Sequence, residues 1–109
     1  MDLFIYAEAE DLHDIAESLT ASISAWIGKD NEKMSLVNQP DKGWLGIDVT
    51  ITAQHQLKKP LNFLYGVAKE HKCNFVIGIL TSDAREDVCY FGHEEGRPDM
   101  YEIATYLEL

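Results

Sequence analysis

The feature that most constrains the fold of this 109-residue sequence is a change in the spacing of its apolar residues along the chain. Between residues 9 and 27 apolar side chains recur every three or four positions, which is typical of a helix with one buried face, and Gly28 ends the run. Residues 45–53 instead alternate apolar and polar side chains, which indicates a strand with one buried face. A chain that switches between these two periods is expected to pack its helices against a sheet.

The remaining segments extend this pattern. We predict strands at 2–7, 33–38, 45–53, 74–81 and 87–92, and helices at 9–27, 58–72 and 98–107. Turn-forming residues at 38–43 and an acidic segment at 82–86 join neighbouring strands, and Pro60 and Pro98 suit first helical turns. The expected fold class is α+β: an α/β sandwich with a mainly antiparallel sheet in the order β-α-β-β-α-β-β-α. It begins like a ferredoxin-like fold and adds a C-terminal strand and helix. No linker interrupts residues 1–109, so one domain is expected.

The chain carries 19 Asp and Glu against 9 Lys and Arg, a formal net charge of −10. Such a chain repels nucleic-acid phosphates and anionic membranes, so neither is expected as a partner, whereas a basic protein would be attracted. The N-terminal residues lack the basic residues of a signal peptide. The longest uncharged apolar run elsewhere, 75–80, is far shorter than the roughly 20 residues of a membrane helix. A cytoplasmic location is therefore expected.

The acids are concentrated at the two ends of the chain. Residues 1–28 hold six acids and no Lys or Arg, and residues 83–109 hold eight acids and two arginines. This segregation favours a binding surface in the last third, with an aromatic residue of a predicted exposed turn as its apolar anchor. The candidate residues are Asp83, Glu86, Asp87, Glu94, Glu95, Asp99 and Trp44.

The acidic residues and Trp44 also admit different roles. The exposed face of the first helix, with Asp11, Asp14 and Glu17, is an alternative patch. Solubility and complementarity to helix dipoles also account for part of the acidic excess. Trp44 can instead fold back to cover the edge of the sheet.

Motifs for enzymatic chemistry are absent from the sequence. There is no glycine-rich phosphate loop and no nucleophile or metalloprotease motif, so we expect neither an enzyme nor a cofactor. Cys73 and Cys89 are predicted to be buried free thiols. His93, Glu94 and Glu95 are metal-ligand types, but adjacent loop residues seldom converge on one ion, so no metal site is expected.

The stretch from Tyr90 to Ile103 carries the pattern Phe-Gly-x-Glu-x-Gly-x-Pro. It resembles the strand-turn-helix ending of small bacterial immunity proteins of polymorphic toxin systems, including contact-dependent growth inhibition. The resemblance implies a protein that binds and neutralises one cognate toxin domain, most often a nuclease. The same residues also suit an ordinary strand-to-helix connection, because Gly92 and Gly96 permit positive φ and Pro98 presets a helical turn. The alternatives are a ferredoxin-like small-molecule-binding or regulatory domain and, third, an enzyme with a His–carboxylate site at His93.

Overall fold

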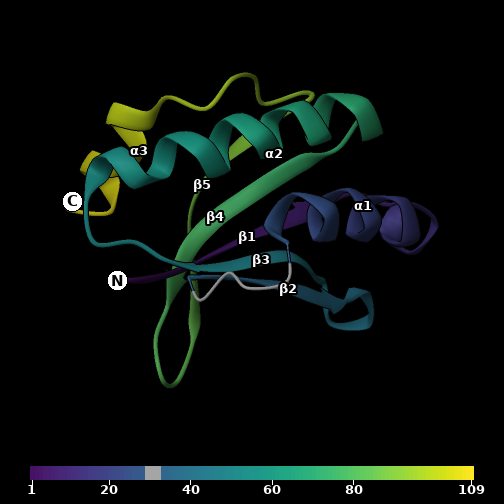
Figure 1. Ribbon diagram of the computed structural model, residues 1–109, viewed down its shortest axis with the longest axis horizontal. Coiled ribbons are helices and arrows are strands. Elements are labelled where there is room, and N and C mark those ends of the chain that lie inside the picture. Colours follow the sequence, from purple (N-terminus) through teal and green to yellow (C-terminus); the bar gives the residue numbers. More distant parts are fainter. Residues whose placement is uncertain (29–32) are drawn as a thin grey trace.

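A five-stranded antiparallel sheet forms the centre of the structure, a computed structural model that describes residues 1–28 and 33–109 (Figure 1). Its strands lie in the order β2-β3-β1-β4-β5. The elements along the chain are β1 (Asp2–Glu8), α1 (Leu12–Ile27), β2 (Met34–Gln39), β3 (Trp44–Thr50), α2 (Lys58–His71), β4 (Asn74–Leu80), β5 (Arg85–Gly92) and α3 (Met100–Tyr106), with short 3₁₀ helices at Pro40–Lys42 and Gln54–Leu57. The predicted α+β class with a mainly antiparallel sheet is confirmed.

Strand β1 lies in the middle of the sheet because both of its faces are apolar. Leu3, Ile5 and Ala7 face one side and Phe4 and Tyr6 face the other, and all five are at most 2% exposed. β1 pairs with β3 along one edge and with β4 along the other. Its backbone is therefore hydrogen-bonded on both sides, as a buried strand requires.

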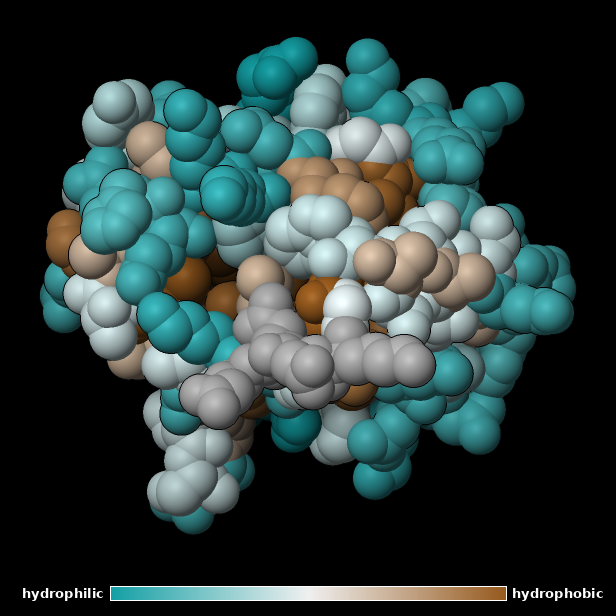
Figure 2. Space-filling model, in the orientation of Figure 1, coloured by the Kyte–Doolittle hydropathy of each residue, from teal (hydrophilic) through white to brown (hydrophobic). Residues whose placement is uncertain are grey.

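All three helices cover one face of the sheet (Figure 1). Leu19 of α1, Leu64 of α2 and Ile103 of α3 are buried in one core with the inward side chains of the strands. Trp26 of α1 stacks on Phe63 of α2 with ring centroids 4.3 Å apart, which ties the two long helices together. In the space-filling view hydrophilic residues cover most of the rim and hydrophobic residues show near the middle (Figure 2). None of the helices in the described residues is long and apolar enough to cross a membrane.

The opposite face is covered in part by the β4–β5 hairpin, which projects away from the helices in Figure 1. The register of the hairpin shifts between Ile77 and Gly78, and such a bulge bends a strand pair. Gly78 allows the close approach, because a Cβ atom there would collide with the Phe4 ring and the Glu86 carbonyl. Phe4 and Tyr6 thus stay buried on the side of the sheet away from the helices.

Two predicted elements of the N-terminal half have an end that is wrong by three residues. Helix α1 begins at Leu12 instead of residue 9, because residues 10 and 11 form a turn before it. The strand predicted at 45–53 ends at Thr50, since the chain then turns into the 3₁₀ helix at Gln54. The alternating pattern continues past the point where the chain leaves the sheet, so spacing alone overextends this strand.

Two further ends, in the C-terminal half, are wrong by two residues. Strand β5 begins at Arg85 instead of residue 87, because Thr81 and Ala84 close the hairpin turn with a backbone hydrogen bond of 2.9 Å. Helix α3 begins at Met100 instead of residue 98. Asp99 is extended and caps the helix through its carboxylate, so Pro98 precedes the first turn.

Candidate functional site

Carboxylates from the two acidic ends of the chain meet where β1 ends. Glu8, Glu10 and Asp11 line a hollow of about 740 Å³ together with Glu94 from the other end of the chain. Asp87 and Glu95 lie close enough to Glu8 for their charges to act on its carboxylate, and Glu8 lies close enough to Tyr90 to act on its hydroxyl. We define the acidic corner as Glu8, Glu10, Asp11, Asp87, Tyr90, Glu94 and Glu95.

The order of the strands produces this meeting. Glu8 at the end of β1 lies opposite Asn74 at the start of β4, and Asn74 lies opposite Gly92 at the end of β5. The ends of β1 and β5, which are far apart in the sequence, therefore lie on either side of the start of β4.

A tight loop after β5 holds the two C-terminal glutamates in place. The Asn74 side-chain oxygen accepts hydrogen bonds from the backbone N–H groups of Glu94 and Glu95, at 3.0 and 3.1 Å. Gly92 and Gly96 exchange two backbone hydrogen bonds of 2.8 Å. Both glycines have positive φ, as predicted, and a Cβ atom on Gly92 would lie 2.7 Å from the Asn74 Cα. The glycines of the sequence pattern thus fix the backbone that presents Glu94 and Glu95.

The carboxylates of the acidic corner repel one another. Burial and the charges of Asp87 and Glu95 raise the pKa of Glu8. The charge of Glu8 in turn raises the pKa of the Tyr90 hydroxyl, with smaller contributions from burial and Asp87. Within the described part of the chain, no lysine or arginine forms an ion pair with these carboxylates. Lys72 also lines the hollow, but among the described residues it forms no ion pair with them, so acidic charge predominates there. Tyr90 is 45% exposed beside these carboxylates and adds an accessible aromatic ring.

The structure divides the carboxylates predicted for the last third. Asp87, Glu94 and Glu95 belong to the acidic corner. Asp83 lies in the hairpin turn at the other end of β5, and Glu86 lies opposite Ile79 near the same turn.

The other predicted acids have separate places. Asp99 caps α3 by accepting the N–H groups of Tyr101 and Glu102, so its carboxylate already has a structural role. Of the alternative patch, Asp11 lies in the acidic corner, whereas Asp14 and Glu17 continue along exposed positions of α1.

The prediction that Trp44 lies in an exposed turn is wrong. Trp44 is the first residue of β3 and is half-buried, with the Arg85 guanidinium carbon 3.7 Å from its ring centroid and the Lys42 ammonium at 4.9 Å. Arg85 Nε also donates to the Tyr6 hydroxyl at 3.3 Å, and that hydroxyl donates to Asp48 at 2.6 Å. Trp44 therefore holds the β4–β5 hairpin against the sheet face. The alternative that it covers the edge of the sheet is not met either, because β3 lies inside the sheet between β2 and β1.

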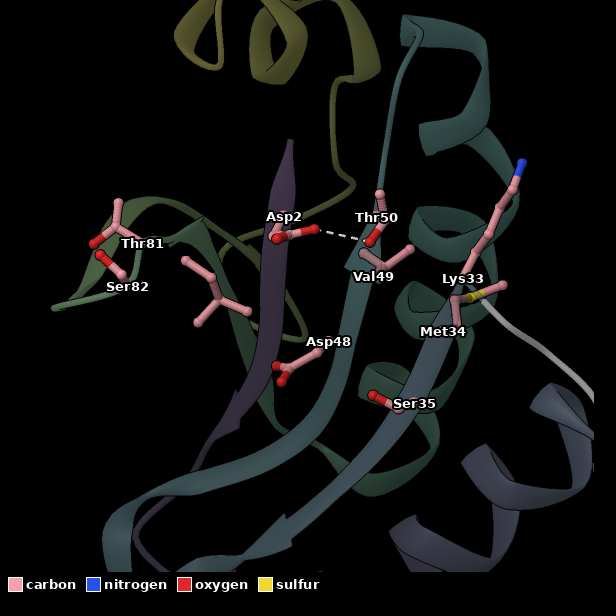
Figure 3. A pocket seen from close by; sticks show the side chains of 10 residues that line it. Asp2, Lys33, Met34, Ser35, Asp48, Val49, Thr50, Thr81 and Ser82 are labelled. Atoms are coloured by element: carbon pink, nitrogen blue, oxygen red, sulfur yellow. Dashed lines mark hydrogen bonds between the residues drawn. The ribbon is translucent and has the colours of Figure 1, made fainter.

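A second hollow, of about 560 Å³, lies on the sheet face beside the hairpin turn (Figure 3). Its polar lining comes from strands β1 to β3 and from the turn. These residues include Asp2, Ser35, Asp48, Thr50, Thr81 and Ser82. Several of their groups already have partners: the Thr50 hydroxyl donates to Asp2 at 2.8 Å, and Asp48 accepts from Tyr6. The hollow is thus a largely polar surface, in which Asp2, Asp48 and Thr50 already have hydrogen-bond partners.

The remaining chemical candidates have structural surroundings. Cys73 is buried as predicted, but Cys89 is only half-buried, and burial raises the pKa of each thiol to about 11. His71 contacts the Val67 carbonyl at 3.1 Å and the Ser18 hydroxyl at 2.9 Å, which links α2 to α1. Among residues 1–28 and 33–109, no three His, Cys, Asp or Glu side chains converge as a metal ion requires.

Glu8, Glu10 and Tyr90 were not among the predicted site residues. The signal that could have found Glu8 is the apolar character of both faces of residues 3–7, which indicates a central strand. The end of a central β1 lies beside β4.

Comparison of this chain with protein-family models, curated proteins and solved structures found no match.

Proposed function

We propose that this protein is an immunity protein that binds and neutralises a basic toxin domain through the acidic corner. The observation that carries the proposal is the crowding of carboxylates around Glu8, whose pKa is raised by burial and by Asp87 and Glu95 beside the exposed ring of Tyr90. A cation supplied by a partner would relieve this repulsion. The acidic corner is therefore suited to bind Lys and Arg side chains of another protein.

A nuclease toxin fits this surface, because a nuclease holds phosphates with basic residues. Carboxylates that bind those residues exclude the nucleic acid substrate. Long-range attraction between the acidic chain and a basic domain also accelerates their association. Tyr90 supplies the aromatic contact that often dominates the binding energy of an interface.

A ferredoxin-like small-molecule-binding or regulatory domain is the alternative. The succession of elements from β1 to β4, with β1 between β3 and β4, supports a ferredoxin-like start followed by an additional strand and helix. A small-molecule site of this kind needs an apolar pocket with a few converging polar groups. The hollow in Figure 3 has a largely polar lining. Another hollow, of about 440 Å³, is more apolar and includes Val49, Ile51 and Pro60 beside His55 and Gln56, and the alternative depends on it. We rank this function second to binding at the acidic corner, where charged side chains from both ends of the chain converge.

The direct test is co-expression of the full chain with the toxin domain encoded by the adjacent gene. We expect the chain to restore growth and to co-purify with that domain. We expect the dissociation constant to rise at least about 10-fold between about 50 and 300 mM NaCl, mainly through slower association. Growth arrest that the chain does not relieve, with no complex formed, would show that the chain is not its inhibitor.

Matched variants locate the contact. The double variant Glu94→Lys/Glu95→Lys should weaken binding more than about 100-fold, while Asp14→Lys/Glu17→Lys, with the same charge change on α1, should change it less than about 3-fold. Tyr90→Ala should weaken binding more than about 10-fold, and Tyr101→Ala, an exposed tyrosine on α3, should not. Equal effects of both charge reversals would assign the binding to net charge instead of the acidic corner.

A further inference from the structure

The two edges of the sheet differ in how they are protected against pairing with another strand. Strand β5 begins with the charged residues Arg85, Glu86 and Asp87, and its ladder with β4 contains a bulge. At its other end the loop returns, and Gly96 hydrogen-bonds to Gly92. Charges, bulges and covering loops are the features that prevent edge-to-edge association.

Strand β2 itself, among the residues that the structure describes, has neither charges nor a bulge. Its sequence, Met-Ser-Leu-Val-Asn-Gln, contains no charge, proline or glycine, and it lies at the opposite edge of the sheet. Leu36 at its centre is 38% exposed. Among the described residues, no other leucine, isoleucine or valine is among the exposed large hydrophobic side chains. An uncharged and exposed edge strand is a template for β-pairing.

The direction of the free backbone groups follows from the pairing of β2 with β3. The Thr50 N–H donates to the Lys33 carbonyl at 2.9 Å, so residue 33 exchanges its hydrogen bonds with β3. Bonding direction alternates along an antiparallel strand, and the backbone N–H and C=O groups of Leu36 and Asn38 therefore point away from β3.

We propose that two copies of this chain associate through antiparallel pairing of their β2 strands, which joins two sheets into one of ten strands. Residues 34–39 carry no charge and the adjoining Lys33 is basic, so two copies of a chain with a net charge of −10 repel each other less at this edge than at its acidic surfaces. A basic partner, in contrast, gains no charge attraction at β2. This inference does not depend on the proposed function.

A two-fold axis at Leu36, the central one of the outward-facing residues of β2, pairs the strand along its whole length. Leu36 then exchanges two backbone hydrogen bonds with Leu36 of the second copy, and the two side chains meet on the helix-covered side of the sheet. An axis at Asn38 would direct the second strand into Pro40, which has no N–H group and begins a 3₁₀ helix. The interface is a small one, so we expect a weak dimer that forms with increasing concentration.

Sedimentation equilibrium of the full chain tests this proposal. Between about 5 µM and 1 mM we expect the apparent mass to rise from 12.4 kDa toward twice that value. Leu36→Pro removes one outward N–H group while sparing the bonds to β3, and Leu36→Lys places like charges at the axis. Both should remain monomeric while keeping the circular dichroism of the wild type. Tyr101→Lys, with the same charge change on α3, should dimerise like the wild type.

A cysteine variant tests the register. In a hydrogen-bonded antiparallel pair the Cα atoms lie about 5.5 Å apart, within the range that a disulfide spans. Leu36→Cys should therefore form a disulfide-linked dimer at least about 10-fold faster under mild oxidation than Gln39→Cys, whose two copies lie apart in this register. A wild type that stays monomeric over the whole concentration range would overturn the proposal. Dimerisation of Leu36→Pro and Leu36→Lys at wild-type strength would overturn it as well.

Discussion

At the residue scale, the Tyr6 hydroxyl connects three strands through two hydrogen bonds. It donates to Asp48 of β3 and accepts from Arg85 of β5, while its ring is buried on the sheet face under the hairpin. Burial, reinforced by the hydrogen bond to Asp48, raises the pKa of Tyr6 from its usual 10 to about 12. The folded state therefore depends on a neutral Tyr6.

We predict that Tyr6→Phe lowers the free energy of unfolding by about 1–2 kcal/mol near pH 7, because Asp48 loses a donor where it is half-buried. In the wild type, the unfolded chain ionises this tyrosine near pH 10 and the folded chain only near pH 12. Its contribution to stability is thus complete below pH 10 and is lost as the pH rises through about 12.

Urea denaturation at pH 7 and absorbance titration at 295 nm measure the two effects. Of the five tyrosines, the one that ionises at the highest pH should no longer contribute to the titration curve of Tyr6→Phe, whereas its contribution should remain in Tyr101→Phe. A titration curve with an unchanged component near pH 12 in Tyr6→Phe would assign that pKa to a different tyrosine.

At the element scale, the bend of the β4–β5 hairpin depends on Gly78. A Cβ atom at this position would collide with the Phe4 ring and with the Glu86 carbonyl of the opposite strand. We predict that Gly78→Ala lowers the free energy of unfolding by about 2–3 kcal/mol, because the hairpin must move off Phe4 and Arg85 must leave Trp44. Amides on both sides of the hairpin turn should also exchange hydrogen faster.

Gly66 provides a matched control in α2. It is exposed, and a Cβ atom there meets no heavy atom within 4 Å. Gly66→Ala should therefore raise stability by about 0.5–1 kcal/mol, through helix propensity. If Gly78→Ala unfolded at the same urea concentration as the wild type, the close packing of the hairpin on Phe4 would be contradicted.

The same elements show what the sequence could predict. Periodic spacing identified the positions of the long helices and of the strands, because burial on one face dictates that spacing. The element ends were less accurate, since they depend on local hydrogen bonds such as the Asp99 cap. The bend of the hairpin leaves no periodic pattern in the sequence. Because this bend brings Arg85 over Trp44, the ring packs under Arg85 instead of lying in an exposed turn.

At the scale of the whole molecule, the acidic corner exists only because of the strand order. The sequence showed acids at both ends of the chain and placed them in two separate candidate patches. The central position of β1 brings part of each patch together and adds Glu8, which no local pattern marked as a site residue. Prediction of this site therefore required the sheet topology, which pairs residues far apart in sequence.

This convergence gives the whole molecule a salt-dependent stability. Burial and the repulsion by Asp87 and Glu95 raise the pKa of Glu8, so its ionised form destabilises the folded chain, and stability falls as the pH rises through the ionisation of Glu8. Glu8 is largely solvated, so we expect Glu8→Gln to raise stability by only about 0.5 kcal/mol at pH 7 and low salt. The gain should disappear at acidic pH as Glu8 becomes protonated, and should shrink above about 500 mM NaCl, where the charges are screened.

Thermal unfolding at about 5 µM, in about 20 and 500 mM NaCl, measures this effect in the absence of association. Glu8→Gln should unfold about 2–4 °C above the wild type in low salt and within about 1 °C of it in high salt. Glu17→Gln on α1 removes the same charge outside the acidic corner and should follow the wild type. The proposed function predicts the opposite sign for binding, because Glu8→Gln removes a carboxylate that contacts the basic toxin domain. An equal gain from both variants would show that the repulsion belongs to the net charge of −10 and not to the acidic corner.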